Sequence, residues 1–219
     1  MKLVFHATFF SVFAFICYKD AEIIPVKALP IPNVFLSKFV WLTMIDLYMQ
    51  TFYHFFGILV ALVGSGKNNK IYDYWGRTLA GPIGLAVTIL FWTLYLADPD
   101  TLAKDDMAKK ILSIQWYNHG IHTLPAISAH LNLLVWKHER FSTTSVLKGI
   151  AIFITLYLID IHVVHHISGF WAYPILGQLA LPARALFILV CVIVVFLCYL
   201  WLAFVDRLVH GDKIKRKNY

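Results

Sequence analysis

The residues of this sequence that could do chemistry are a threonine and a histidine from two separate apolar stretches. Thr43 begins a series of polar residues in one stretch, and His122 belongs to the motif 117–123 in another. A threonine hydroxyl is a poor nucleophile unless a base takes its proton, and histidine is the usual base near neutral pH. If the fold brings the two together, the pair could cleave an ester or an amide.

Polar residues that follow Thr43 could support such a reaction. Asp46, Gln50 and His54 come three, seven and eleven residues after Thr43. In a helix this spacing places all four side chains on one face. Asp46 could orient an imidazole, as the acid of a catalytic triad does. His54 lies deeper, and we expect no direct role for it.

The motif around His122 places several polar groups in the apolar stretch 114–136. Gln115, Asn118, His119 and His122 are expected to share one side of a helix. Polar groups inside a membrane usually mark a site, because they are expensive to bury in hydrocarbon. The amide of Asn118 could donate a hydrogen bond to a developing oxyanion. His119 is expected to be a supporting or structural group.

Further histidines leave alternative functions open. His162, His165 and His166 stand at helical spacing near the end of another apolar stretch, where packing or headgroup contacts are expected. Histidines at such spacing can ligate zinc, and His122 facing His165 could hold a haem. The polar series after Thr43 could instead serve a proton-coupled transporter. His130 is expected to have no direct role.

The composition identifies the environment in which these side chains act. The 219 residues are 60% hydrophobic and 14% charged, against about 25% charged in soluble domains. With a mean hydropathy of +0.70 and several apolar stretches near 20 residues long, the chain is an integral membrane protein. The net charge of +7 then sets orientation and predicts no nucleic-acid partner. Cys17, Cys191 and Cys198 lie in apolar stretches and are interpreted as packing residues.

The apolar stretches predict an all-α integral membrane fold, a bundle of six transmembrane helices in a single domain, 1–219. The first stretch could be a signal peptide, but Lys2 is its only early positive charge and no small-residue cleavage motif precedes Lys19. We therefore expect a retained helix there. The predicted spans are about 3–18, 39–63, 78–97, 114–136, 147–167 and 183–204, followed by a basic cytosolic tail, 205–219.

Charge placement predicts the orientation of these spans. Twelve of the 19 lysines and arginines fall on the side that holds both termini, so both termini are expected in the cytosol. Thr43 and His122 would then lie roughly 6 Å and 10 Å from the start of their spans on the non-cytosolic side, at 1.5 Å per residue. Both residues are thus expected in the same leaflet, where an amphiphilic substrate could reach them.

The motifs also carry a family resemblance. The segment 117–125, YNHGIHTLP, resembles the NHGMHT/NHAMHT signature of the androgen-induced gene 1 family. Further segments are similar to that family in the same order, namely 43–50, 77–82 with Phe91-Trp92, and 165–174.

The resemblance implies six transmembrane helices and hydrolysis, inside the membrane, of fatty acid esters of hydroxy fatty acids. It implies a threonine nucleophile and a histidine, which correspond by motif to Thr43 and His122. At the position of Asp46 the family has aspartate or asparagine, so an obligatory acid role is not expected. The implied reaction needs no metal or other cofactor, and its partner is a lipid from the bilayer. The expected location is the plasma membrane or the endoplasmic reticulum.

Overall fold

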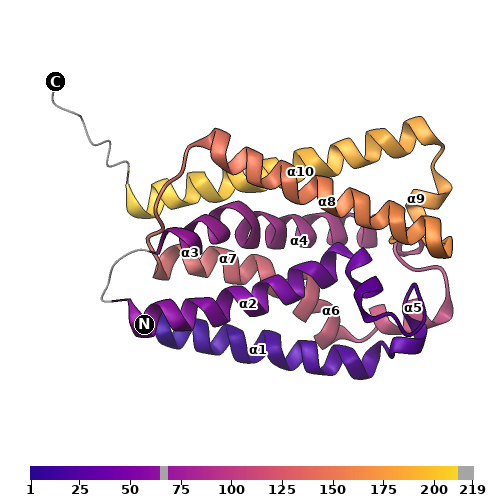
Figure 1. Cartoon of the computed structure of the whole chain (residues 1–219), viewed down its shortest axis with the longest axis horizontal. Helices are drawn as coiled ribbons and strands as arrows, with labels where there is room; N and C mark the ends of the chain where they lie inside the picture. Colours follow the sequence, from indigo (N-terminus) through magenta and orange to yellow (C-terminus); the bar gives the residue numbers. More distant parts are fainter. Residues whose placement is uncertain (65–68, 212–219) are drawn as a thin grey trace.

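The computed structural model describes residues 1–64 and 69–211, and within these residues it contains helices and no strand. Five helical segments have the length and composition to cross a bilayer (Figure 1). Each has at least 22 residues, which corresponds to about 33 Å at 1.5 Å per residue. The prediction of an all-α, multi-pass membrane protein is confirmed. The segments are α1 (Lys2–Ile23), α2 (Leu42–Val63), Lys70–Ala97, α8 (Thr143–Ser168) and α10 (Leu181–His210).

The third of these segments is continuous but not uniform. It consists of α3 (Lys70–Trp75), a turn of π-helix, η3 (Gly76–Ala80), and α4 (Gly81–Ala97). The predicted span, 78–97, therefore begins about two turns too late.

The predicted fourth span, about 114–136, is a broken helix. It contains α6 (Gln115–His122) and α7 (Leu124–Val135), which meet at Thr123. Pro125 explains the break, because proline supplies no N–H and restricts the residue before it. With 8 and 12 residues, neither helix alone is long enough to cross a bilayer.

Short elements gather at one end of the bundle, opposite the end where α1 begins and α10 finishes (Figure 1). We call the first the α5/α9 end and the second the terminal end. The short elements are η1 (Val26–Ala28), η2 (Phe35–Val40), η4 (Pro99–Thr101), α5 (Asp106–Leu112) and α9 (Pro174–Gln178).

The last helix is longer than the sequence analysis predicted. The tail was expected from residue 205, but α10 continues to His210. Asp206 explains this continuation, because its buried carboxylate accepts hydrogen bonds from Arg77 and Arg140, each at 3.0 Å. The remainder of the predicted tail, 212–219, lies outside the described residues.

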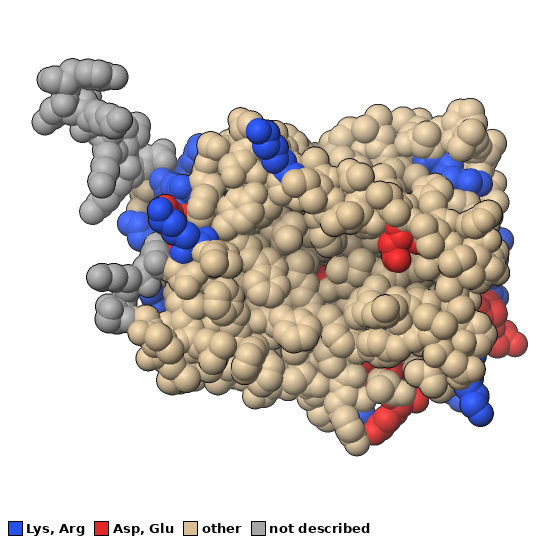
Figure 2. Space-filling model, in the orientation of Figure 1, with Lys and Arg blue, Asp and Glu red and all other residues tan. Residues whose placement is uncertain are grey.

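Packing unites these helices into one body. The largest apolar cluster joins α2, α4, α7, α8 and α10 around side chains such as Ile83 and Val146, both fully buried. A second cluster packs α1 onto α2 and α6 around Phe13. In Figure 2 most charged side chains on the visible face lie toward the two ends, and the broad middle is mainly uncharged. That distribution suits a body with hydrocarbon around its middle.

Candidate active site

Thr43 and His122, 79 residues apart in sequence, meet at the α5/α9 end. Oγ1 of Thr43 lies 3.3 Å from Nε2 of His122, and both side chains are buried, with 8% and 4% exposed. The threonine belongs to the first turn of α2, whereas the histidine is the last residue of α6. The helix break at Thr123 therefore ends α6 at the residue that faces Thr43.

The contacts of His122 indicate which ring nitrogen carries the proton. Nδ1 faces two oxygens of Asn118, the side-chain Oδ1 at 2.6 Å and the main-chain O at 3.1 Å. Since both are acceptors, Nδ1 is the N–H, and Nε2 presents its lone pair to Thr43. Nδ2 of Asn118 donates to the carbonyl of Leu112 at 3.1 Å, which fixes the amide in this orientation. Asn118 thus orients the imidazole, and its NH2 group, which the sequence offered as an oxyanion donor, already donates to Leu112 O.

An aromatic ring fixes the plane of the same imidazole. Phe91 of α4 stacks on His122 with ring centroids 3.4 Å apart and planes within 5°. Together with Asn118, it leaves the ring few ways to turn away from Thr43. A fixed ring matters because proton transfer requires a maintained donor–acceptor geometry.

Tyr173 brings a second hydroxyl to the site. Gly169 ends α8 in the left-handed conformation, with φ at 71°, and the chain then turns back toward α2. The phenol oxygen accepts the N–H of Leu42 at 3.2 Å and lies beside the side chain of Thr43. Burial raises the pKa of Tyr173, so the hydroxyl keeps its proton and can donate a hydrogen bond.

Thr43, His122 and Tyr173 all line one large cavity of about 350 Å³. The remaining lining is mainly apolar and comes from α2, α4, α8, α10 and the short elements of the α5/α9 end. Its size falls within the usual range for small-molecule sites, about 300–1,000 Å³. The arrangement therefore offers a hydroxyl, a base and a hydrogen-bond donor to a hydrophobic ligand.

Asp46 lies on the expected face of α2 but does not contact the imidazole in any recorded hydrogen bond. Its Oδ1 accepts from Nε2 of Gln50 at 2.9 Å, and Gln50 also donates to the carbonyl of Ala80 at 2.7 Å. Oδ2 has no hydrogen-bond partner among the described residues. The orienting role proposed for Asp46 therefore falls to Asn118 in this structure.

Gln115 and His119, the other polar residues singled out in the 114–136 stretch, do not share the buried position of Asn118 and His122. All four polar residues lie on one side of α6 by helical spacing, as expected, but Gln115 and His119 are exposed whereas Asn118 and His122 are buried. His119 instead contacts the hydroxyl of Thr123 through Nδ1 at 3.0 Å. That hydroxyl also accepts the indole N–H of Trp92 at 3.0 Å, so this group ties the helix break to α4.

The remaining histidines take structural positions. His130 accepts the indole N–H of Trp201 at 2.9 Å, which links α7 to α10. His165 stacks on Trp171 with centroids 3.8 Å apart, while His162 and His166 are exposed. Across the described residues, no three histidine, cysteine, aspartate or glutamate side chains come together as a metal site.

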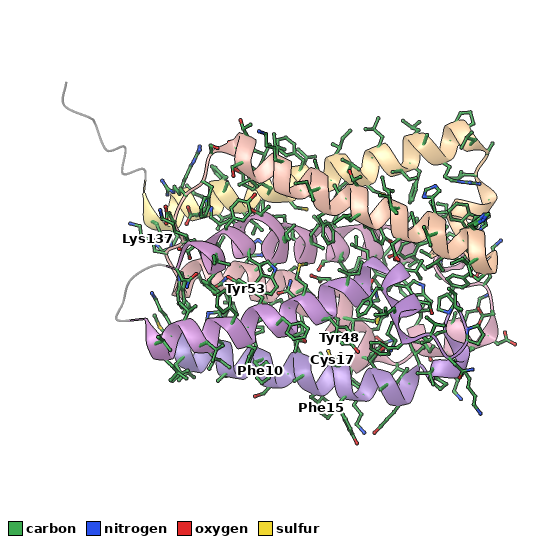
Figure 3. The ribbon with its side chains drawn as sticks, viewed as in Figure 1. Phe10, Phe15, Cys17, Tyr48, Tyr53 and Lys137 are labelled. Atoms are coloured by element: carbon green, nitrogen blue, oxygen red, sulfur yellow. The ribbon has the colours of Figure 1, made fainter. Side chains whose placement is uncertain are left out.

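His54 belongs to a second polar cluster, nearer the terminal end. Its Nε2 contacts Ser128 at 2.7 Å and its Nδ1 contacts His6 at 2.9 Å, while Nε2 of His6 contacts the Tyr72 hydroxyl at 2.9 Å. Tyr53, labelled in the interior of Figure 3, accepts a hydrogen bond from Asn132 of α7 at 2.7 Å. This cluster joins four helices by hydrogen bonds.

Two side chains of the site, Phe91 and Tyr173, were not predicted from the sequence as site residues. Both were present in segments that were noted, Phe91-Trp92 and the motif 165–174. Tyr173 follows Trp171 in a connection that is typical of membrane-interface aromatics, so the sequence offered no reason to expect a contact between Tyr173 and α2. The available signal was an aromatic residue with a polar tip, four residues after the glycine that ends α8.

Comparison with known proteins finds one matching family and two similar human proteins among its results. The profile described as FAR-17a/AIG1-like protein matches residues 1–207. The human androgen-induced gene 1 protein is 29% identical over 179 residues, which cover 74% of each chain. The human androgen-dependent TFPI-regulating protein is 25% identical over 160 residues, 69% of this chain and 68% of the relative. No solved structure matches the chain significantly.

Proposed function

Since this chain belongs to the FAR-17a/AIG1-like family, we propose that it is an intramembrane threonine hydrolase of fatty acid esters of hydroxy fatty acids. Its products are a fatty acid and a hydroxy fatty acid. One observation carries the proposal: Oγ1 of Thr43 lies 3.3 Å from Nε2 of His122 on the wall of a mainly apolar cavity. The contact of Nδ1 with Asn118 adds to it, because this contact leaves Nε2 as the base.

The first half of the reaction acylates the threonine. Oγ1 of Thr43 attacks the ester carbonyl carbon while Nε2 of His122 takes the hydroxyl proton. The oxyanion forms beside the Tyr173 hydroxyl and the N-terminus of α2, both of which favour negative charge. As the tetrahedral intermediate collapses, the alkoxide of the hydroxy fatty acid leaves and takes the proton from Nε2.

The second half restores the enzyme. Water attacks the acyl-threonine carbonyl, and Nε2 of His122 takes a proton from that water. The new intermediate expels Oγ1 of Thr43, which recovers its proton from the imidazole. One ester and one water therefore give one acid and one alcohol, and the mechanism assigns every proton movement to side chains of the chain itself.

The proposed topology has six spans with both termini in the cytosol, in the plasma membrane or the endoplasmic reticulum. Two observations support it. The broken helix α6–α7 contributes 8 and 12 helical residues, which together suit one crossing. Short elements of the α5/α9 end line the cavity, so in this topology the site would lie in the non-cytosolic leaflet.

The test is turnover of a purified protein in lipid nanodiscs with a defined ester substrate. Thr43→Ala and His122→Ala are each expected to abolish product formation, as measured by mass spectrometry. Thr51→Ala and His162→Ala are matched controls: Thr51 lies two turns further along α2 and donates to Leu47 O, and His162 is exposed. Both controls should keep normal turnover.

A covalent label identifies the nucleophile independently. A lipophilic fluorophosphonate should modify Oγ1 of Thr43, and peptide mass spectrometry should locate the adduct there. The His122→Ala variant should label much more slowly, because its hydroxyl has no base. Full turnover by the Thr43→Ala variant, or an adduct at another residue, would overturn the proposed mechanism.

A further inference from the structure

The connection between α4 and α6 closes part of the cavity. Residues 102–105, Met107 and Ala108 from this connection line it, and Ala103 is buried. Two charged side chains line the cavity, Lys104 and Asp105, and both belong to this connection. The other lining side chains that the structure describes are of uncharged types, and His122 among them can accept a proton at Nε2. The fixed charges of the cavity lining therefore come from this one connection, and the rest of the lining is mainly apolar.

Three acidic residues of this connection, Asp98, Asp100 and Asp105, have partners within the connection itself. Asp105 caps α5, since its Oδ1 accepts the N–H of Ala108 at 2.8 Å. Asp100 pairs with Lys109 at 2.8 Å, and Oδ1 of Asp98 accepts the N–H of Asp100 at 3.0 Å. Lys104, by contrast, has no recorded hydrogen bond or ion pair within the described part of the chain. Lys104 is exposed and lines the cavity, so its side chain is available to an anionic ligand.

We propose that Lys104 binds the carboxylate of the lipid substrate and so makes the enzyme selective for acidic lipid esters. This inference rests on the proposed hydrolase function. The carboxylate would pair with the ammonium of Lys104, the hydrocarbon chains would contact the apolar part of the lining, and the internal ester would lie at Thr43. The flexible stem of lysine allows its charge to stay at the aqueous boundary while the methylenes contact apolar surface.

The expected selectivity follows from the difference between the charged and the apolar parts of the cavity lining. A neutral ester of the same length fills the apolar cavity equally well but offers no partner to Lys104. Contact at a remote charged group affects ground-state binding and transition-state binding alike, so it should change KM and leave kcat nearly constant. An exposed ion pair of this kind contributes about a fivefold change in binding.

The experiment compares one substrate with its own methyl ester. Wild-type protein in nanodiscs is assayed with a fatty acid ester of a hydroxy fatty acid, and then with the same molecule whose carboxylate is methylated. We expect a KM about fivefold lower for the free acid. Lys104→Met should remove that difference, and Lys104→Glu should reverse it by repelling the carboxylate. Lys110→Met is the matched control, an exposed lysine of α5 outside the cavity lining.

The outcomes separate this inference from the function on which it rests. If wild-type protein cleaves neither substrate, the proposed hydrolase function fails. If it cleaves both with equal KM, or if Lys104→Met keeps the preference for the acid, carboxylate recognition by Lys104 is overturned. Turnover of the methyl ester reports correct folding of each variant, because that substrate does not use Lys104. An equal loss of both substrates in Lys104→Met would also contradict the inference.

Discussion

Two hydroxyl–imidazole pairs lie in the interior of this bundle, and the shorter contact is not the one beside the large cavity. Oγ of Ser128 lies 2.7 Å from Nε2 of His54, whereas Oγ1 of Thr43 lies 3.3 Å from Nε2 of His122. Distance alone would select Ser128 as the nucleophile. The cavity beside Ser128 has only about 30 Å³, enough for about one water, whereas Thr43 borders about 350 Å³.

The other contacts of the two histidines explain the difference. His54 has His6 at its second nitrogen and the rings of Phe9 and Phe13 stacked on it, at 5.2 and 5.7 Å. Such a cluster satisfies buried polar groups and holds helices together. His122 has an orienting amide at Nδ1 and a hydroxyl at Nε2 that faces open space. The cavity beside its hydroxyl partner is therefore what distinguishes His122, the proposed base, from the buried His54.

The largest predicted effect on turnover comes from removing the Thr43 hydroxyl, and removal of the Ser128 hydroxyl is the comparison. Thr43→Ala should lower kcat/KM for ester hydrolysis by at least about 1,000-fold, because it removes the proposed nucleophile. Ser128→Ala should leave turnover per folded molecule within about threefold, since no substrate can reach Ser128. Parallel kinetics of the two variants in nanodiscs measure this difference. Loss of turnover in Ser128→Ala with retention in Thr43→Ala would reverse the assignment of the two pairs.

Substitution of Asn118 should give the next largest loss of catalytic rate. Asn118→Ala removes the acceptor that fixes the Nδ1–H tautomer of His122, so kcat should fall by about 100-fold. Asn118→Asp keeps an acceptor oxygen but cannot donate to Leu112 O, and it should recover part of the loss. Steady-state kinetics of both variants test the role. Equal and small losses in both would indicate that the amide only packs against the ring.

Some residues of this site could be predicted from the sequence and others could not. The difference is whether a residue's position follows from its type and helical spacing or from a contact with a distant segment. Thr43 and His122 were predictable, because residue type, spacing and depth all converge on them. The break between α6 and α7 was visible in Pro125 but was not used, and the length of the apolar stretch suggested one continuous helix. Asp46 was expected near an imidazole because helical spacing gives a shared face, but it does not give the partner of each group on that face.

Asn118 shows a different limit of sequence reasoning. Its amide can donate or accept, and the sequence does not contain the position of the Leu112 carbonyl that decides between them. Tyr173 shows the same limit at longer range, since its hydroxyl meets a main-chain N–H 131 residues earlier. Contacts between distant segments require the packed helices, whereas the class of protein follows from composition alone.

Tyr173→Phe should have a smaller effect than either change above. The substitution keeps the ring and removes the hydroxyl that is proposed to stabilise the oxyanion, so kcat should fall by about tenfold or more with little change in KM. Because burial raises the pKa of the Tyr173 hydroxyl, the wild-type rate should not decline through phenol ionisation up to about pH 9. A pH–rate profile of both proteins checks this. Tyr95→Phe, on α4 and outside the cavity lining, is the control.

The smallest predicted effect on catalysis belongs to the second pair, and it completes the comparison. His54→Phe removes the hydrogen-bond partner of Ser128 Oγ and of Nδ1 of His6, which should reduce stability by about 1–3 kcal/mol per group. Thermal unfolding in detergent should therefore shift downward, whereas kcat of the folded fraction should stay unchanged. The exposed His162→Phe variant should change neither quantity. A selective fall in kcat at full stability would show that His54 communicates with Thr43, and the two clusters would then be parts of one site.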